Sequence, residues 1–220
     1  MEIISEEGFR YDGRKPNELR EVAIKSGYLN KCGYIDLQQG GTKVRSILYG
    51  PKEKGQYKEN IKFKISFYDV ARQESGKHEK KIDECETLLS ELFKPIISIS
   101  ESNYLEINIL IKQDDGSLIS TLINSVTILL CYCGVQIKDM CISITSCFFK
   151  GISLLDLSNN EENIRIPSLV LGYFPHRKTI GLFQSTGKTD TDSIKKLYFE
   201  NLKAIDTLFS VFSNFLKNIN

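Results

Sequence analysis

The chain has 220 residues and a formal net charge of +1, with 29 lysines and arginines against 28 aspartates and glutamates. A free-standing nucleic-acid-binding domain usually carries a clear basic excess, so this balance speaks against that class of protein. Hydrophobic residues make up 41% of the sequence, and a chain of this length buries about 70% of its unfolded surface on folding. We therefore expect a single domain over residues 1–220, with a core that needs no disulfide or metal.

The cysteines and histidines do not predict a metal site. The six cysteines form no Cys-x-x-Cys pair, and His78 and His176 lie in different segments, whereas a zinc site needs ligand pairs at short spacing. The longest strongly apolar stretch, residues 126–133, is far shorter than the roughly 18 residues of a membrane span. The first residues do not resemble a signal peptide. We expect an intracellular protein with buried, reduced cysteines, no metal and no membrane span.

The first third of the chain predicts an arm followed by strands. Residues 11–20 combine an Asp-Gly turn, a proline and basic side chains, which indicates an exposed surface arm. Residues 43–49 and 61–67 alternate apolar and polar side chains, as half-buried strands do. The pair Gly40-Gly41 predicts a hairpin turn before the first of these strands. It does not predict a phosphate loop, because that motif leads into a helix.

Charge is segregated along the next part of the chain. Residues 42–81 hold 11 basic and 5 acidic residues, a net of +6, and residues 82–116 hold 2 basic and 8 acidic residues, a net of −6. A basic segment can steer a polyanion toward a protein. Charge alone favours the alternative, that both segments are solvated faces.

Two helices are predicted in the middle of the chain, with a strand between them. Residues 79–93 place apolar side chains at helical spacing, and Pro95 lies just beyond their end. Residues 104–112 alternate and predict a strand. Residues 118–133 are apolar on most faces, which indicates a helix buried between other layers, with Gly134 as its C-cap.

The last third predicts three strands and a long helix. The strands are residues 140–149, 166–174 and 179–184, and a turn at residues 175–178 joins the last two. Residues 192–216 have the pattern of an amphipathic helix, with N-cap candidates at Thr189, Asp190 and Thr191. Strands separated by helices in this way predict an α+β fold.

Two polar motifs are candidates for chemistry. Residues 114–117, Asp-Asp-Gly-Ser, precede the buried helix, whose N-terminal N–H groups can hold a phosphate. Two carboxylates at that point would repel one, which favours Ser117 or Asp115 as a helix cap. Residues 156–163 contain Asp156, Glu161 and Glu162. Such acids can bind magnesium or transfer protons, but a solvated loop is the favoured interpretation.

The order of five motifs resembles the RNase PH family. These motifs run from about residue 9 to the C-terminus: DGRKPNELR, QGGTKV, LYGPK, QDDGSLISTLINS and LLDLSNNEE. They are most similar to the RNase PH-like subunits of the eukaryotic RNA exosome. Residues 115–118 with Asn124 resemble the ribosomal RNA-processing protein 46 type, while the N-terminal motif would also suit the 41 type. The resemblance implies the RNase PH-like α+β fold (ribosomal protein S5 domain 2-like), with helices flanking sheets.

The same resemblance implies that this chain lacks a working catalytic site. Active members degrade RNA from the 3′ end with inorganic phosphate, which they bind with Gly-Gly-Thr-Arg. The corresponding string here is Gly116-Ser117-Leu118-Ile119, so Ile119 stands in place of the arginine clamp. Glu162 and Ser168 stand where active members carry two aspartates, so one carboxylate that could assist the leaving oxygen is missing. The implied sites are a degenerate phosphate site and a degenerate acidic site.

The resemblance finally implies partners and a location. Arg72, Lys77, Lys80 and Lys81, before the first helix, would contact the RNA backbone. The chain would be a structural subunit of a hexameric ring, beside a 43-type RNase PH-like subunit and below S1/KH cap subunits, with single-stranded RNA in the channel and no cofactor. It would support rRNA processing and mRNA turnover in the nucleus, nucleolus and cytoplasm. The alternatives are a phosphate-dependent 3′-to-5′ exoribonuclease and an α+β interaction protein without an RNA role, and the isolated chain could form a homodimer.

Overall fold

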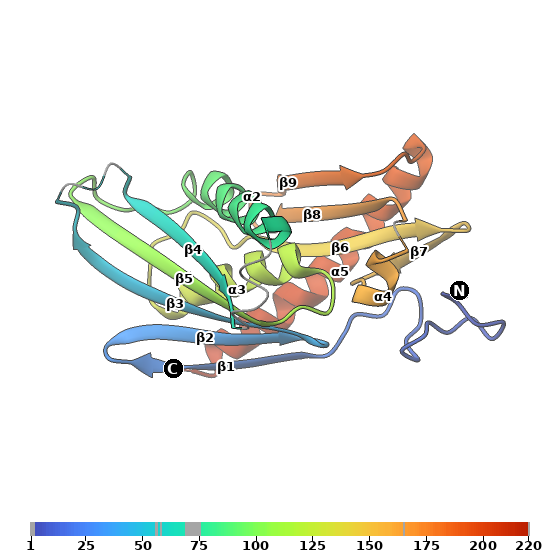
Figure 1. Cartoon of the computed structure of the whole chain (residues 1–220), viewed down its shortest axis with the longest axis horizontal. Coiled ribbons are helices and arrows are strands. Elements are labelled where there is room, and N and C mark those ends of the chain that lie inside the picture. The colour runs from blue at the N-terminus through green and yellow to red at the C-terminus, as the bar shows by residue number, and fades with distance from the viewer. Residues whose placement is uncertain (1–2, 56, 58, 69–75, 165, 220) are drawn as a thin grey trace.

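Two β-sheets enclose a central helix in the computed structural model, which describes residues 3–55, 57, 59–68, 76–164 and 166–219 (Figure 1). The strands in the described residues are β1 (Val22–Leu29), β2 (Cys32–Gln39), β3 (Thr42–Glu53), β4 (Ile61–Phe67), β5 (Asn103–Gln113), β6 (Ile142–Phe149), β7 (Ile152–Leu155), β8 (Ser168–Phe174) and β9 (Thr179–Thr186). The helices in the same residues are α2 (Gly76–Phe93), α3 (Leu118–Tyr132), α4 (Asn159–Glu162) and α5 (Thr191–Lys217). The predicted α+β fold class is confirmed.

The first sheet has the order β1-β2-β3-β5-β4. All its neighbouring strands are antiparallel except β4 and β5, which are parallel and are connected through α2, as a parallel pair requires a crossover. The predicted hairpin at Gly40-Gly41 is confirmed, since Gln39 pairs with Thr42. The sequence does not predict strands β1 and β2. Strand β1 has a weak apolar pattern because it lies at the edge of the sheet and half of its residues are exposed.

Helix α3 is the centre of the core. It contacts β2 and β3 of the first sheet and β6 and β8 of the second, and 12 of its 15 residues are buried. Its buried polar side chains have partners; for example, the hydroxyl of Thr127 donates to the carbonyl of Cys141 at 2.7 Å. Gly134 ends the helix as predicted. It has a φ of 70°, and the N–H of Val135 reaches back to the carbonyl of Leu130 at 2.9 Å, which is the Schellman arrangement.

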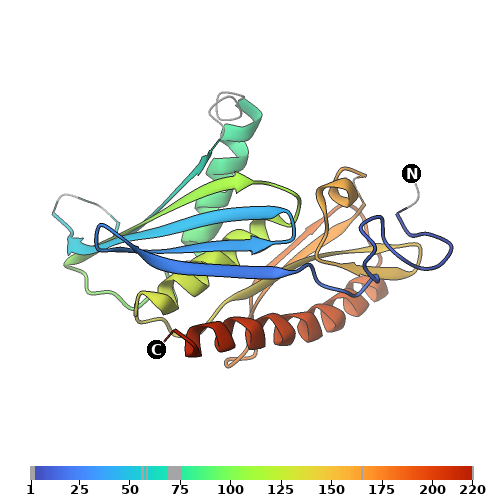
Figure 2. The ribbon, with the colours of Figure 1, turned by 90° about the horizontal axis from the view of Figure 1, so that it is seen from below.

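The second sheet has the order β7-β6-β8-β9 and is antiparallel. Helix α5 runs along it and reaches back toward the end of the molecule that holds the first sheet (Figure 2). Of the three N-cap candidates, Asp190 is the cap: its Oδ2 accepts the N–H of Ser193 at 2.9 Å. The hydroxyl of Ser193 donates to Oδ1 of Asp190 at 2.7 Å, and this bond, together with the one from the backbone N–H, keeps the pKa of Asp190 below its usual range.

Within the described residues, no helix is long and apolar enough to cross a membrane. The same residues hold no group of three or more histidine, cysteine or acidic side chains arranged to bind a metal ion. All six cysteines are free thiols, and Cys85, Cys141 and Cys147 are buried. Burial raises the pKa of the Cys85 thiol to about 11, so this side chain acts as a small apolar residue.

Candidate functional site

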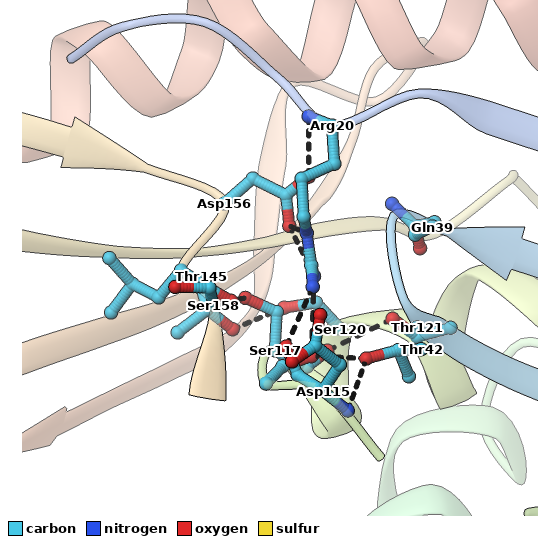
Figure 3. Close-up of polar contacts among 12 residues, drawn as sticks. Arg20, Gln39, Thr42, Asp115, Ser117, Ser120, Thr121, Thr145, Asp156 and Ser158 are labelled. Carbon is cyan, nitrogen blue, oxygen red and sulfur yellow. Dashed lines mark hydrogen bonds and ion pairs between the residues drawn. The ribbon is translucent and has the colours of Figure 1, made fainter. Parts of the chain in front are cut away.

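Arg20 connects three segments that are distant in sequence. Its guanidinium donates to Oδ1 of Asp156 at 2.7 and 3.0 Å, and its backbone N–H donates to Oδ2 of the same carboxylate at 3.0 Å. The guanidinium also donates to the carbonyls of Asp115 and Gly116 at 2.9 and 3.2 Å. In Figure 3 the Arg20 side chain lies between Asp156 and the turn before α3. The pair therefore fixes this turn against the segment that precedes α4.

A second buried arginine holds α4 itself. The guanidinium of Arg10 makes a two-pronged contact with the carboxylate of Glu161 and also donates to the carbonyl of Asp156 at 3.1 Å. Arg10 is 3% exposed and Glu161 4% exposed. Glu161 also accepts the backbone N–H of Ser158 at 2.8 Å and so completes a capping box at the start of α4.

These contacts overturn two expectations. The acidic run is not a solvated loop, because α4 forms within it and both Asp156 and Glu161 are buried. The N-terminal arm is not merely an exposed arm either, because Arg10 and Arg20 are buried. The arginines and the acids neutralise each other across more than 130 residues, a pairing that neither segment reveals on its own.

The expected cap of α3 is also corrected. Ser117 occupies the N-cap position with a left-handed backbone (φ 51°), but its side chain makes no capping hydrogen bond. Its hydroxyl donates instead to the carbonyl of Leu157 at 2.9 Å. Asp115 does not replace it, because its contributions to this turn come from its backbone: the N–H donates to Thr42 Oγ1 at 2.9 Å, and the carbonyl accepts from Arg20 and Asn159.

Gly116 has a structural reason to be glycine. Its φ is 91°, and a Cβ at this position would lie about 2.5 Å from the backbone of Ser158 and Asn159. The close approach seats the start of α4 directly against the turn before α3. The two segments that the sequence predicted as separate degenerate sites are thus neighbours.

A cleft of about 490 Å³ opens at this junction. It brings together Ile119 from the phosphate motif, Glu162 and Ser168 from the acidic motif, and Lys81 from the basic stretch. Its remaining lining residues are Leu118, Thr145, Leu157, Ile166, Val170, Gln184, Thr186 and Gly187. The residues from three predicted sites therefore face one opening between α2, α3, α4 and the second sheet.

The carboxylate of Glu162 occupies the N-terminal end of α3. Its Oε1 accepts the backbone N–H of Ser117 at 2.7 Å. Glu162 is solvent-accessible as a residue, but its carboxylate is partly surrounded by protein, and this desolvation raises its pKa while the hydrogen bond from Ser117 opposes the rise. Since a helix N-terminus favours an anion, this end of α3 is already bonded to a carboxylate of the chain itself.

The rest of the cleft offers little positive charge to an anion. Ile119 presents an apolar side chain there, and the Nζ of Lys81 forms an ion pair with Oδ2 of Asp114 at 3.1 Å. Ser168 shares a hydrogen bond of 2.7 Å with the hydroxyl of Thr186. Among the described lining residues, the cleft therefore holds one carboxylate, one cation that is already paired, the amide of Gln184 and hydroxyl groups.

The lysines predicted to contact RNA lie within helix α2 and not before it. Helix α2 begins at Gly76 rather than at residue 79, so Lys77, Lys80 and Lys81 belong to its first two turns instead of preceding it. Lys80 is exposed. Arg72 lies outside the described residues.

Family models and related proteins match most of this chain. The 3′ exoribonuclease family model for domain 1 matches residues 18–136, and the model for domain 2 matches residues 139–198. The chain belongs to the 3′ exoribonuclease (RNase PH) family. The first match covers the first sheet with α2 and α3, and the second covers the second sheet with the start of α5. The cleft of this family member lies where the two matched regions meet.

Relatives are similar over nearly the whole chain. An exosome complex component RRP41 homolog of Arabidopsis thaliana is 27% identical, over 93% of this chain and 91% of the relative. The exosome complex component Rrp41 of Thermoplasma acidophilum is also 27% identical, over 94% of this chain and 90% of the relative. The crystal structure of rice Rrp46 has a TM-score of 0.81 at 21% identity and covers 94% of this chain and 100% of that chain. An archaeal exosome core has a TM-score of 0.74 at 17% identity and covers 94% of this chain and 92% of that chain. Both structures share the fold of this chain.

Proposed function

We propose that this chain is a non-catalytic structural subunit of an RNA exosome ring. One observation carries the proposal: the N–H of Ser117 at the start of α3 is bonded to Glu162, and Ile119 stands where the family's phosphate-clamping arginine is expected. A phosphate entering the cleft would meet a carboxylate in its place, and the described residues that line the cleft include no arginine. Relatives named as exosome components cover nine tenths of the chain or more, which supports the assembly.

The proposed subunit type is ribosomal RNA-processing protein 46, with the 41 type as the alternative. The Asp115-Gly116-Ser117-Leu118 string and the similarity in fold to rice Rrp46 support the first type, while the names of the sequence relatives support the second. In either case the chain would lie between two other RNase PH-like subunits, with S1/KH subunits above the ring and single-stranded RNA in its channel. The proposed site of action is the nucleus, including the nucleolus, and the cytoplasm.

An affinity purification of the tagged chain from its native cells tests the assembly. We expect RNase PH-like and S1/KH chains to co-purify in equal amounts, as mass spectrometry would show. Recovery of the chain without RNase PH-like partners would contradict the proposal and would favour an interaction protein with no RNA role.

A phosphorolysis assay tests the absence of catalysis. The purified chain is incubated with a single-stranded RNA and inorganic phosphate, and nucleoside diphosphates are measured by chromatography. We expect none above the level without phosphate. Release of nucleoside diphosphates that disappears in Glu162→Ala would overturn the proposal in favour of a phosphate-dependent 3′-to-5′ exoribonuclease. That alternative has one observation in its favour, since a carboxyl group with a raised pKa in a cleft suits a general acid.

A gain-of-binding variant tests the observation that carries the proposal. Combining Glu162→Ala with Ile119→Arg removes the internal anion and supplies a guanidinium at the start of α3. We expect the double variant to bind inorganic phosphate measurably by calorimetry, whereas the parent chain and Glu162→Ala alone do not. Phosphate binding by the parent chain would contradict this explanation.

A further inference from the structure

The first sheet has one face that no described helix covers. Residues of β2, β3 and β4 alternate between buried and accessible along each strand, and the buried set faces α2 and α3. The accessible set forms the opposite face, which we call the outer face. The strand register brings Lys25, Asp36, Arg45 and Leu110 into one row across it.

The outer face is strongly basic. It carries Lys25, Lys43, Arg45, Lys62, Lys64 and Lys112. It carries two acids, Asp36 and Glu106, and three of its cations are paired with them. Asp36 is bonded to Arg45 and Lys112, at 2.6 and 2.8 Å, and Glu106 lies 3.6 Å from Lys64. Among the described residues, Lys25, Lys43 and Lys62 have no hydrogen bond or ion pair, so their charges face solvent uncompensated. Four of the six cations come from the segment with a net charge of +6, and the cleft near α3 uses none of them.

Two tyrosines give this face flat apolar surfaces. The ring of Tyr34 lies across Gly27, where a Cβ would be 2.8 Å from the tyrosine hydroxyl. The guanidinium of Arg45 lies 4.9 Å from the centre of the same ring. Tyr49 follows on β3, with the Nζ of Lys52 at 5.8 Å from its ring. Both tyrosines are partly accessible and lie beside cations. Aromatic rings next to cations are the features with which sheet surfaces stack nucleotide bases and hold their phosphates.

The composition of the face distinguishes between two kinds of occupant. Lysine is depleted in protein–protein interfaces, because its desolvation is costly and its side chain loses freedom. A phosphate backbone gains from such lysines by releasing counterions, without burying them. Five strands spaced by about 4.8 Å give a flat width of roughly 19 Å, which suits an extended chain of nucleotides.

We propose that the outer face of the first sheet binds single-stranded nucleic acid, with the unpaired Lys25, Lys43 and Lys62 on the phosphates and Tyr34 and Tyr49 as stacking surfaces. This binding surface is separate from the cleft at α3 and does not depend on the function proposed above. The near-neutral charge of the whole chain is compatible with it, because this face carries six cations against two acids and the balancing acids lie elsewhere.

A charge-reversal series on the full chain tests the proposal. The variant Lys25→Glu, Lys43→Glu and Lys62→Glu changes the net charge by the same amount as a control, Lys178→Glu, Lys188→Glu and Lys195→Glu, whose lysines are exposed beside the second sheet. Binding of a fluorescent, unstructured RNA of about 12 nucleotides, within the range of known sheet-based sites, is followed by anisotropy across a salt series. Circular dichroism and thermal melts establish that both variants are folded.

We expect the outer-face variant to weaken RNA binding at least tenfold, with the control changing it less than threefold. The slope of log affinity against log salt should become shallower by about 2, since each phosphate contact of a single strand contributes about 0.7. Tyr34→Ala should weaken binding while leaving this slope unchanged, because stacking does not depend on counterions. Equal losses in the two reversal variants, or unchanged binding in the outer-face variant, would overturn the proposal.

Two further arms identify the occupant. In the first, a polyglutamate peptide replaces the RNA. If the peptide binds as tightly as the RNA, and if reversing the same lysines abolishes its binding, the proposal is overturned and the face is assigned to an acidic protein. Ultraviolet crosslinking of the RNA followed by peptide mass spectrometry should recover β2 and β3 peptides; crosslinks confined to α2 and α3 would equally overturn it. Neither result bears on the purification and phosphorolysis assays, which test the proposed function separately.

Discussion

At the scale of single residues, the packing of the turn before α3 depends on charged side chains that are paired inside the protein. Burying a charged group is costly unless it is paired and hydrogen-bonded, and Arg20 meets this condition with contacts to one carboxylate and two backbone carbonyls. A planar guanidinium can make these contacts at once, and an ammonium cannot. The arginine therefore determines how the turn before α3 sits against the segment before α4.

Replacing this arginine by lysine should destabilise the protein. Arg20→Lys keeps the charge but loses the two-pronged contact with Asp156, and we expect the free energy of unfolding to fall by about 3 kcal/mol. The control is Arg45→Lys, whose pair with Asp36 is partly exposed and should contribute less than about 1 kcal/mol. Urea denaturation of both variants measures the difference. Equal decreases in the free energy of unfolding would show that burial does not make the Arg20 pair more stabilising than the Arg45 pair.

Glu162 makes stability depend on pH in a direction opposite to that of an ordinary surface carboxylate. Its pKa in the folded protein is raised above the usual 4.5 by desolvation, so the folded state holds this proton more tightly than the unfolded state. The contribution of this group is therefore most favourable below pH 4.5 and is lost as pH rises through the higher folded pKa.

Glu162→Gln tests this linkage because it keeps an oxygen acceptor for the N–H of Ser117 and cannot ionise. We expect the stability of the parent chain, measured relative to the variant by urea denaturation from pH 4 to pH 8, to decline with increasing pH above about 4.5 and then level off. A difference that stays constant, or that rises with pH, would contradict the raised pKa.

At the scale of whole elements, the long helices and the alternating strands followed from local pattern. Helix α3, expected over residues 118–133, extends over Leu118–Tyr132. The prediction agrees with the structure because the apolar faces of the helix and the glycine after it are local signals. Strand β7 and helix α4 were missed since each has only four residues and is held by contacts with the distant N-terminal arm. A short element carries too little periodicity to be recognised alone.

One buried residue of α5 works against the stability of that helix. Asn201 is completely buried, and both polar atoms of its amide have no hydrogen-bond partner among the described residues. A polar group buried without a partner costs about 1–3 kcal/mol. A leucine side chain has a shape similar to that of asparagine but lacks these polar atoms. We therefore expect Asn201→Leu to raise the free energy of unfolding by about 1–2 kcal/mol.

Thermal and urea denaturation measure this change, with Asn214→Leu as a control at an exposed position of the same helix. The control should change stability by less than about 0.5 kcal/mol. A loss of stability in Asn201→Leu would show that the amide of Asn201 contributes favourably and would contradict the prediction.

At the scale of the whole molecule, the near-zero net charge conceals a separation of charges in space. The basic segment contributes to two places: the start of α2, where Lys80 and Lys81 lie, and the outer face of the first sheet. Lys81 is partly neutralised by Asp114. The two surfaces therefore differ in how much free positive charge they offer to a polyanion.

The lysines of α2 are expected to act in the assembled ring. Reversing Lys77, Lys80 and Lys81 to Glu should weaken RNA binding by the ring and make its salt dependence shallower, because fewer counterions are released. Filter binding across a salt series measures both quantities. An unchanged slope would identify these lysines as a solvated face.

The sequence alone predicts the class of fold, the three long helices, most of the strands, the hairpin at Gly40-Gly41 and the glycine that ends α3. For the N-cap of α5 it leaves three candidates, of which the structure selects Asp190. These features depend on periodicity and on the preferences of neighbouring residues, which are local. The three-dimensional arrangement is needed to see that Arg10 and Arg20 are buried, that Glu162 bonds to Ser117, and that cations from β1, β3, β4 and β5 share one face. These arrangements join residues far apart in the chain, and which charges meet is set by strand order and register rather than by any single segment.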